Sequence, residues 1–240
     1  MEFNSLNFLK FIHNIIDQIK YNILIGMINT YVINLDSRPD NWSDIKKHFK
    51  GTNFKLTRIP AVVKNVGAYG NFLSFIKTLK LAKKKGLSEI LILEDDCLPM
   101  KGIEKRWETI KDWLDKNPDK WDIYSGGAHS IYFPKPIGES GNIKFYNPLW
   151  SVTSHWTFIP SRSYTKLLEH YKKYSGWANY ISMLGVDVHN NFFKTVISHP
   201  FIAYQKSGYS NLRKTYRNRY KIFKNAERGL SRKVKKHRVF

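Results

Sequence analysis

Cysteine, acidic residues and long apolar runs are scarce in this 240-residue sequence, and each scarcity excludes a class of protein. Cys97 is the single cysteine, so no intramolecular disulfide can form and a disulfide-stabilised secreted scaffold is excluded. The longest uncharged, apolar-rich run, residues 21–35, is shorter than the roughly 18 residues that a membrane-spanning helix needs. Together these features favour a cytoplasmic protein that contacts a membrane, if at all, only at its surface.

The shortage of acidic residues leaves the chain strongly basic. It has 19 Asp and Glu against 40 Lys and Arg, a formal net charge of +21, which favours anionic partners such as nucleotide diphosphates, nucleic acids or anionic membranes. Residues 213–240 hold 12 of the cations and one acid, Glu227. We expect these residues to form a basic tail, either a solvated helix or a disordered arm, that contacts an anionic membrane. Nucleic acid is the less favoured partner.

No repeat and no linker rich in Pro or Gly divides the chain, so we predict one catalytic domain at 27–212. Residues 1–26 have apolar residues at helical spacing and are expected to form an amphipathic N-terminal extension. Apolar runs and helical periodicities alternate along the first half of the domain, which indicates parallel crossovers and an α/β fold. The predicted strands lie at 30–35, 54–59, 89–93, 122–125, 151–159 and 195–198, and the predicted helices at 42–49, 71–85, 103–117, 161–174 and 186–193.

Three consecutive carboxylates, Glu94, Asp95 and Asp96, follow directly after the apolar strand ILIL. Ligands of open α/β sheets collect beyond the carboxyl ends of strands, and adjacent acids repel one another unless a cation compensates them. Carboxylate oxygens suit Mg²⁺ and Mn²⁺, which bind substrate phosphates at the same time. The run therefore predicts a metal site at Glu94 and Asp96 that neutralises a diphosphate leaving group. The structural alternative is a strand that simply ends at a solvated edge.

Four stretches, in order, resemble glycosyltransferase family 25, which contains the lipooligosaccharide and procollagen galactosyltransferases. The resemblance implies a GT-A-type nucleotide-sugar-binding fold with a central, mostly parallel sheet flanked by helices. It also implies a UDP-sugar donor, typically UDP-galactose, with Mn²⁺ or Mg²⁺, inversion at the anomeric carbon, and a glycan, lipid-linked saccharide or protein as acceptor. The matching stretches are YVINLDSRPDNW at 31–42, RIPAV at 58–62, GAYGNFLSF to LILEDDCLP at 67–99 and HPFIAYQKSGYSNL at 199–212.

The same resemblance assigns roles to individual side chains. Two departures matter, because Asn71 and Phe75 stand where family members commonly have a cysteine and a histidine, and this leaves the donor sugar and the acceptor open. The residues expected to contact the donor are Asn34, Asp36, Arg38, Gly70, Ser74, Glu94, Asp95 and Gln205.

A general base must take the proton of the acceptor hydroxyl. Asp187, in LGVDVHNNF, is the first candidate because it is placed like the distal aspartate of the family, with N-capping of a helix as the alternative. His155 is the second candidate and His189 a lesser one, although a histidine in an aromatic stretch is more often a packed residue. Gly126 and Gly127 either let a ligand approach the backbone or make a turn.

Two other classes of function are consistent with parts of the sequence. A non-catalytic adaptor that binds nucleic acid or an anionic membrane would use the basic tail. A metal-dependent phosphoryl-transfer or hydrolytic enzyme would use the clustered carboxylates. Four tryptophans are expected either in the core or stacked on sugar rings, namely Trp121, Trp150, Trp156 and Trp177.

Overall fold

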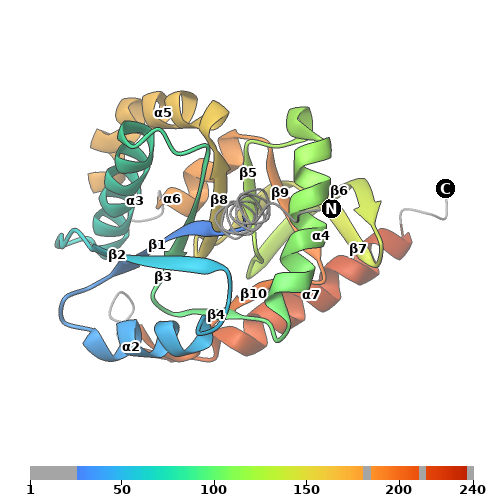
Figure 1. Cartoon of the computed structure of the whole chain (residues 1–240), viewed down its shortest axis with the longest axis horizontal. Coiled ribbons are helices and arrows are strands. Elements are labelled where there is room, and N and C mark those ends of the chain that lie inside the picture. Colours follow the sequence, from blue (N-terminus) through green and yellow to red (C-terminus); the bar gives the residue numbers. More distant parts are fainter. Residues whose placement is uncertain (1–25, 181–184, 211–214, 237–240) are drawn as a thin grey trace, which may run out of the picture.

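A computed structural model describes residues 26–180, 185–210 and 215–236 of the chain (Figure 1). Its centre is an eight-stranded sheet with the strand order β2-β1-β3-β8-β5-β9-β7-β6. The strands are β1 (Ile28–Asn34), β2 (Phe54–Pro60), β3 (Glu89–Glu94), β5 (Ile123–Ser125), β6 (Ser130–Ser140), β7 (Ile143–Val152), β8 (Trp156–Pro160) and β9 (Thr195–His199). The extension predicted at 1–26 lies, apart from residue 26, outside the described residues.

The predicted parallel crossovers form the first half of the sheet. Strand β1 pairs in parallel with both β2 and β3, and the connections run through α2 (Pro39–His48) and α3 (Gly67–Lys84). Successive residues of β3 face opposite sides of the sheet, so each side has its own core. Leu91 and Leu93 pack with the tryptophans of α4 (Ile103–Lys116), whereas Ile90 and Ile92 pack with α3 and α5 (Ser161–Tyr180).

The second half of the sheet is mixed in direction. Strand β8 is antiparallel to both β3 and β5, β5 is parallel to β9, and β7 is antiparallel to β9 and β6. The α/β class with helices on both faces is thus confirmed. The long hairpin of β6 and β7 was not predicted, because Pro134, Pro136 and Pro148 interrupt its alternation. A 3₁₀ turn at Pro118–Lys120 precedes β5.

The basic segment at the C-terminal end is part of the folded body. Residues Thr215–Arg217 form β12, which pairs with β11 (Gly208–Ser210), and α7 (Arg219–Lys236) follows. Phe223, Glu227 and Leu230 recur at helical spacing and are buried beside β6 and β10 (Ala203–Gln205). The prediction of a solvated or disordered tail is therefore wrong for this part of α7, because one face of the helix is a packed stripe.

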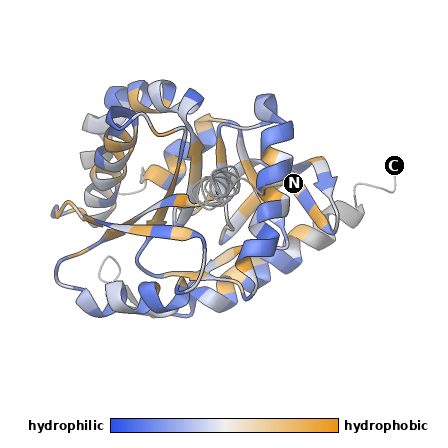
Figure 2. Cartoon of the chain, viewed as in Figure 1, coloured by the Kyte–Doolittle hydropathy of each residue, from blue (hydrophilic) through white to orange (hydrophobic). Residues whose placement is uncertain are grey.

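Figure 2 shows the apolar residues concentrated on the central strands and on the helix faces turned toward them. The polar residues lie mainly on the outer faces of the helices. No helix in the described part of the chain is both long and apolar enough to cross a bilayer.

Candidate active site

The three consecutive carboxylates lie where β3 leaves the sheet. Glu94 is the last residue of β3, and Asp95 and Asp96 turn the chain into the short strand β4 (Cys97–Pro99). Strand β4 pairs antiparallel with β10, in a register that puts Gln205 opposite Cys97. The amide nitrogen Nε2 of Gln205 consequently lies 3.0 Å from Oδ2 of Asp96 and 3.4 Å from Oε2 of Glu94. One neutral NH₂ group thus bridges two carboxylates.

Glu94 receives further hydrogen bonds from two segments that are distant in sequence. The hydroxyl of Ser154 donates to Oε1 of Glu94 at 2.5 Å, and the amide of Asn71 donates to the same oxygen at 3.3 Å. Burial raises the pKa of Glu94, and the negative charges of Asp187 and Asp95 act in the same direction. Asn71, noted in the sequence only as a departure from a family pattern, therefore belongs to the site.

Asp95 points toward the opening strand of the domain. Nδ2 of Asn34, at the end of β1, donates to Oδ2 of Asp95 at 2.7 Å, while Oδ1 of Asn34 accepts from Nε of Arg58 at 2.7 Å. Arg58 also pairs with the largely exposed Asp36 at 2.5 Å. Burial raises the pKa of Asp95, and the Asn34 hydrogen bond and the positive charge of Arg38 oppose this shift. The predicted residues of the β1 end are thus gathered beside the carboxylates.

The donor set at Glu94 and Asp96 fits a hard divalent cation. Burial, together with the negative charges of Glu94 and Asp95, raises the pKa of Asp96 to about 8. The protein alone therefore stabilises the ionised form of Asp96 poorly, and a bound cation would compensate for this. Across the described ranges, no group of three or more His, Cys, Asp or Glu side chains is arranged to hold a metal. Two carboxylates are nevertheless the usual protein share for Mg²⁺ or Mn²⁺ when substrate phosphates and water complete the shell.

Asp187 lies in α6 (Val186–His189), a single helical turn. The N-cap of α6 is Gly185, so the alternative role of Asp187 as N-cap is wrong. Its Oδ1 accepts the backbone N–H of Val188 at 3.1 Å. Burial raises the pKa of Asp187, and its charge in turn raises the pKa of Glu94, which puts the two carboxylates within electrostatic reach of each other.

Arg219, the first residue of α7, brings a cation to this group of acids. The first turn of α7 is tied to the site, because the N–H of Tyr220, the next residue, donates to Oγ of Ser207 at 3.3 Å, and Ser207 lies two residues after Gln205. The charge of Arg219 opposes the upward pKa shifts of both Asp96 and Asp187. Its half-buried guanidinium makes no hydrogen bond to any residue in the described ranges. Arg219 was not predicted as a site residue, because it is one of 12 Lys and Arg residues in the segment that was expected to be a tail.

Two predicted donor-binding residues instead fasten α3 to the loop that follows β2. Ser74 is fully buried, and its hydroxyl donates to the carbonyl of Gly70 and accepts the N–H of Val62, both at 2.7 Å. A Cβ at Gly70 would lie 2.4 Å from the carbonyl oxygen of Val62, so only glycine fits there. Within the protein, Gly70 and Ser74 thus fix the start of α3 and position Asn71, and their predicted contact with the donor stays a prediction.

The two candidate histidines are interior residues. His155 is fully buried, with Nδ1 2.7 Å from the hydroxyl of Thr153 and its ring against Phe223. Burial lowers the pKa of His155 to about 3, which argues against a catalytic imidazole, and its backbone carbonyl instead accepts the N–H of Glu94 at 3.1 Å. His189 is likewise buried, in an aromatic cluster with Phe72 and Tyr171.

The glycine pair and the tryptophans also have packing roles. A Cβ at Gly126 would overlap the ring of Trp156, and a Cβ at Gly127 would lie 2.6 Å from the carbonyl of Ala203, so both glycines serve close packing within the protein. Trp121 and Trp156 are buried in the core, whereas Trp150 is 36% exposed. The side chain of Trp177 lies outside the described ones.

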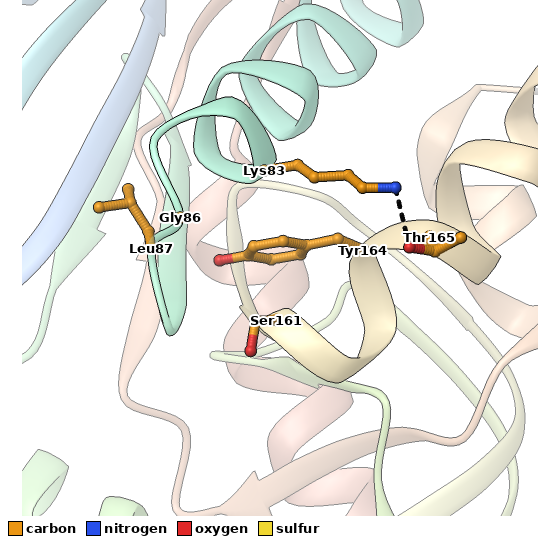
Figure 3. Close-up of a pocket in the computed structure, with 6 residues that line it drawn as sticks. All are labelled: Lys83, Gly86, Leu87, Ser161, Tyr164 and Thr165. Atoms are coloured by element: carbon orange, nitrogen blue, oxygen red, sulfur yellow. Dashed lines mark hydrogen bonds between the residues drawn. The ribbon is translucent and has the colours of Figure 1, made fainter.

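A small pocket lies at the opposite end of β3, between the end of α3 and the start of α5 (Figure 3). Nζ of Lys83 donates to the hydroxyl of Thr165 at 2.9 Å, and the ring of Tyr164 lies between Leu87 and Thr165. None of its six lining residues is acidic, and Ser161 at its base bonds to the residue before Glu89. We therefore place the candidate site at the Glu94 end of β3.

Comparison with known proteins finds limited likeness. No family model and no curated protein matches the chain, so the resemblance to glycosyltransferase family 25 is not confirmed. A glycosyltransferase involved in the glycosylation of the major capsid of PBCV-1 is similar with a TM-score of 0.39 and 12% identity, over 64% of this chain and 67% of that one. Mannose-1-phosphate geranyltransferase from Thermus thermophilus also has a TM-score of 0.39, with 9% identity over 70% of this chain. This chain spans 57% of that enzyme.

Proposed function

We propose that this chain is a metal-dependent glycosyltransferase that moves a hexose from a UDP-sugar to a hydroxyl group of a glycan, a lipid-linked saccharide or a protein. The observation that carries the proposal is the shared amide of Gln205 between Glu94 and Asp96 at the carboxyl end of β3. Two poorly solvated carboxylates held this way suit the recognition of a cation and a diphosphate. Galactose is the sugar that the sequence resemblance favours.

Donor binding is divided among three groups of residues. Glu94 and Asp96 would hold Mn²⁺ or Mg²⁺, which neutralises negative charge on the diphosphate when bound. Asn34, which is hydrogen-bonded to Asp95 and Arg58, would lie beside the bound nucleoside. Arg219 presents a guanidinium that donates to no residue in the described part of the chain, and its planar set of donors suits phosphate oxygens.

In the proposed transfer step, Asp187 is the general base. The acceptor oxygen forms a bond to the anomeric carbon as the bond from that carbon to the diphosphate oxygen breaks, and the electron pair leaves with UDP. The carboxylate of Asp187 takes the proton of the acceptor hydroxyl, and its raised pKa brings it closer to the strength that a general base needs. Attack from the face opposite the diphosphate inverts the anomeric carbon.

The decisive experiment measures UDP release from a panel of UDP-sugars in the presence of Mn²⁺, with and without simple sugar acceptors. We expect turnover with at least one donor, and a loss of at least about a hundredfold in Asp96→Asn. The folded state of this variant should stay intact, because asparagine still accepts from Gln205 and no longer buries a charge.

Asp112→Asn is the matched control, since Asp112 pairs with Lys116 on the exposed face of α4 and should leave turnover unchanged. Full activity in Asp96→Asn would refute the proposal. Phosphate release from simple phosphoesters without turnover of any UDP-sugar would instead identify a hydrolytic enzyme.

A further inference from the structure

The β6–β7 hairpin exposes four large apolar side chains at two adjacent positions of its paired strands. Tyr132 and Trp150 are direct cross-strand partners and are 52% and 36% exposed, and the residues between them and the next pair, Phe133 and Leu149, are 75% and 69% exposed. Monomeric proteins rarely leave neighbouring large apolar residues in water without a partner for them. This hairpin surface, Tyr132, Phe133, Leu149 and Trp150, is not used by the proposed transfer chemistry.

The backbone at Phe133 is unusual in a way that favours exposure. Its φ is 47°, and it is the single residue other than glycine with positive φ among those described. The left-handed region is disfavoured for bulky side chains, and such strain tends to persist where it serves a function. The ring of Phe133 lies in solvent rather than in the core.

A second polypeptide is a poor fit to the same surface. Strand β6 is the last strand of the sheet order, so its outer edge would be the place for another chain to add a strand. Pro134 and Pro136 remove two backbone donors from that edge, and Lys135 between them is exposed. These features block strand addition, so a partner would have to contact the side chains of the hairpin and not its backbone.

The chemistry of the surroundings points to an anionic bilayer. Helix α7 packs directly against β6, and its exposed cations include Lys221 and Arg228, while Lys135 and Lys144 are exposed on the hairpin itself. Trp and Tyr favour the interface of a membrane, whereas Phe and Leu, the two most exposed members, have no polar atom for a sugar and suit hydrocarbon. Stable membrane association generally needs an apolar and a basic contribution together.

The hairpin surface is also connected to the candidate site. Ser151, next to Trp150, donates its N–H to Oδ1 of Asn191 at 2.7 Å, and Nδ2 of Asn191 donates to the carbonyl of Asp187 at 3.0 Å. We propose that the hairpin surface inserts into an anionic lipid bilayer beside the cations of α7, and thereby holds the Asp187 side of the site at the membrane. The hairpin thus provides the apolar contact that the basic residues alone lack.

Vesicle sedimentation with the full chain tests this proposal without any nucleotide sugar, so its outcome is separate from that of the proposed function. We expect binding to vesicles of phosphatidylcholine mixed with phosphatidylglycerol, and much weaker binding to phosphatidylcholine alone. The double variant Phe133→Gly with Leu149→Ser should bind at least about tenfold more weakly. Glycine relieves the positive φ, so the thermal midpoint of Phe133→Gly should equal or exceed that of the unchanged protein.

Val63→Ser is the matched control, because Val63 is 77% exposed in the loop after β2, at the other end of the sheet order. Lys221→Glu combined with Arg228→Glu should weaken binding mainly at low salt. Unchanged vesicle binding in the hairpin variant, or an equal loss in Val63→Ser, would overturn the proposal. If the hairpin variant bound vesicles unchanged but had a higher KM for a soluble sugar acceptor, the hairpin surface would be an acceptor site instead.

Discussion

A single arginine distinguishes the site of this chain from a simple acidic cluster. Arg219 lies close enough to Asp96 and Asp187 to oppose the upward shift of the pKa of each, yet it donates no hydrogen bond within the described residues. A cation held in this way is available to a ligand that brings its own negative charge. In the proposed transferase, Arg219 would therefore bind the diphosphate of the donor.

We expect Arg219→Ala to lower kcat by about 10²–10³-fold, because the charge that develops on departing UDP loses a stabilising partner. UDP should bind more weakly to the variant, whereas uridine should bind equally well to both proteins. Calorimetric titration with UDP and with uridine separates the two effects. Lys221→Ala, on the exposed face of the same helix, is the control. An equal loss of uridine affinity would indicate a disturbed fold instead.

The role of Asp187 has a pH signature. Burial raises its pKa, and a base must be ionised to work, so kcat should fall as pH decreases through that raised pKa. Arg219→Gln removes a charge that lowers the pKa of Asp187, so the acid limb of the profile should move to higher pH. Asp187→Asn should lose about 10²–10⁴-fold in kcat with donor affinity retained. A profile that does not move in Arg219→Gln would contradict the coupling.

At the scale of elements, one buried carboxylate fixes α7 to the body. Glu227 accepts the N–H of Phe201 and the hydroxyl of Tyr204, each at 2.8 Å, and Nζ of Lys224, one turn earlier in α7, donates to its Oε2 at 3.2 Å. Glu227→Ala leaves both donors buried without an acceptor. We therefore expect a loss of roughly 2–4 kcal/mol in the free energy of unfolding, measured by urea denaturation.

Glu227→Gln is the informative companion, because it keeps one acceptor oxygen and should lose less stability than alanine does. If the two variants unfolded like the unchanged protein, α7 would be only loosely attached. The expectation of a free basic tail would then regain support.

The regular elements were predictable from the sequence because their apolar patterns are uninterrupted. Residues 89–93 form a continuous apolar run that matches β3, and the periodic segment at 71–85 matches most of α3. The hairpin escaped prediction since its prolines interrupt the alternation of side chains. The packing of α7 was not predicted either. Two apolar residues and one acid on a basic helix are a weak signal unless the surface of β6 and β10, against which they pack, is known.

The site was predictable only in part for a similar reason. The carboxylates form a recognisable run, and Asn34 and Gln205 were expected from the resemblance of their surroundings. Asn71, Ser154 and Arg219 reach the same place through tertiary contacts between segments about 20 to 120 residues apart. Gly70 and Ser74 show the opposite case, in which residues of a matching stretch serve the scaffold.

For the molecule as a whole, buried histidines set a limit on acid tolerance. Burial lowers the pKa of His155 to about 3 and that of His189 to about 4, whereas unfolded histidine has a pKa near 6.5. Below about pH 6.5 the unfolded chain therefore binds protons that the folded chain does not. Each residue then removes up to about 1.4 kcal/mol of stability per pH unit, until its folded pKa is reached.

The effect of one histidine has to be measured as the difference between a variant and the unchanged protein, because the carboxylates with raised pKa values make the folded state more stable as pH falls. His189→Phe, an aromatic substitution among Phe72, Tyr171 and Phe192, should weaken the pH dependence of unfolding between about pH 6.5 and 4. Stability at pH 8 should change less than stability at pH 4.5. Parallel curves for the two proteins would show that His189 is charged in the folded state.

The amide of Gln205 has a consequence for the order of events in the life of the protein. Because this neutral group already occupies the space between Glu94 and Asp96, the chain can complete its folding before any cation arrives. If the proposed metal binds, folding and metal loading would then be separate steps, and the second could be slow or reversible. The identity of the bound ion would be decided by whichever suitable cation the surroundings supply, rather than by the ion that happened to be present when the chain was made.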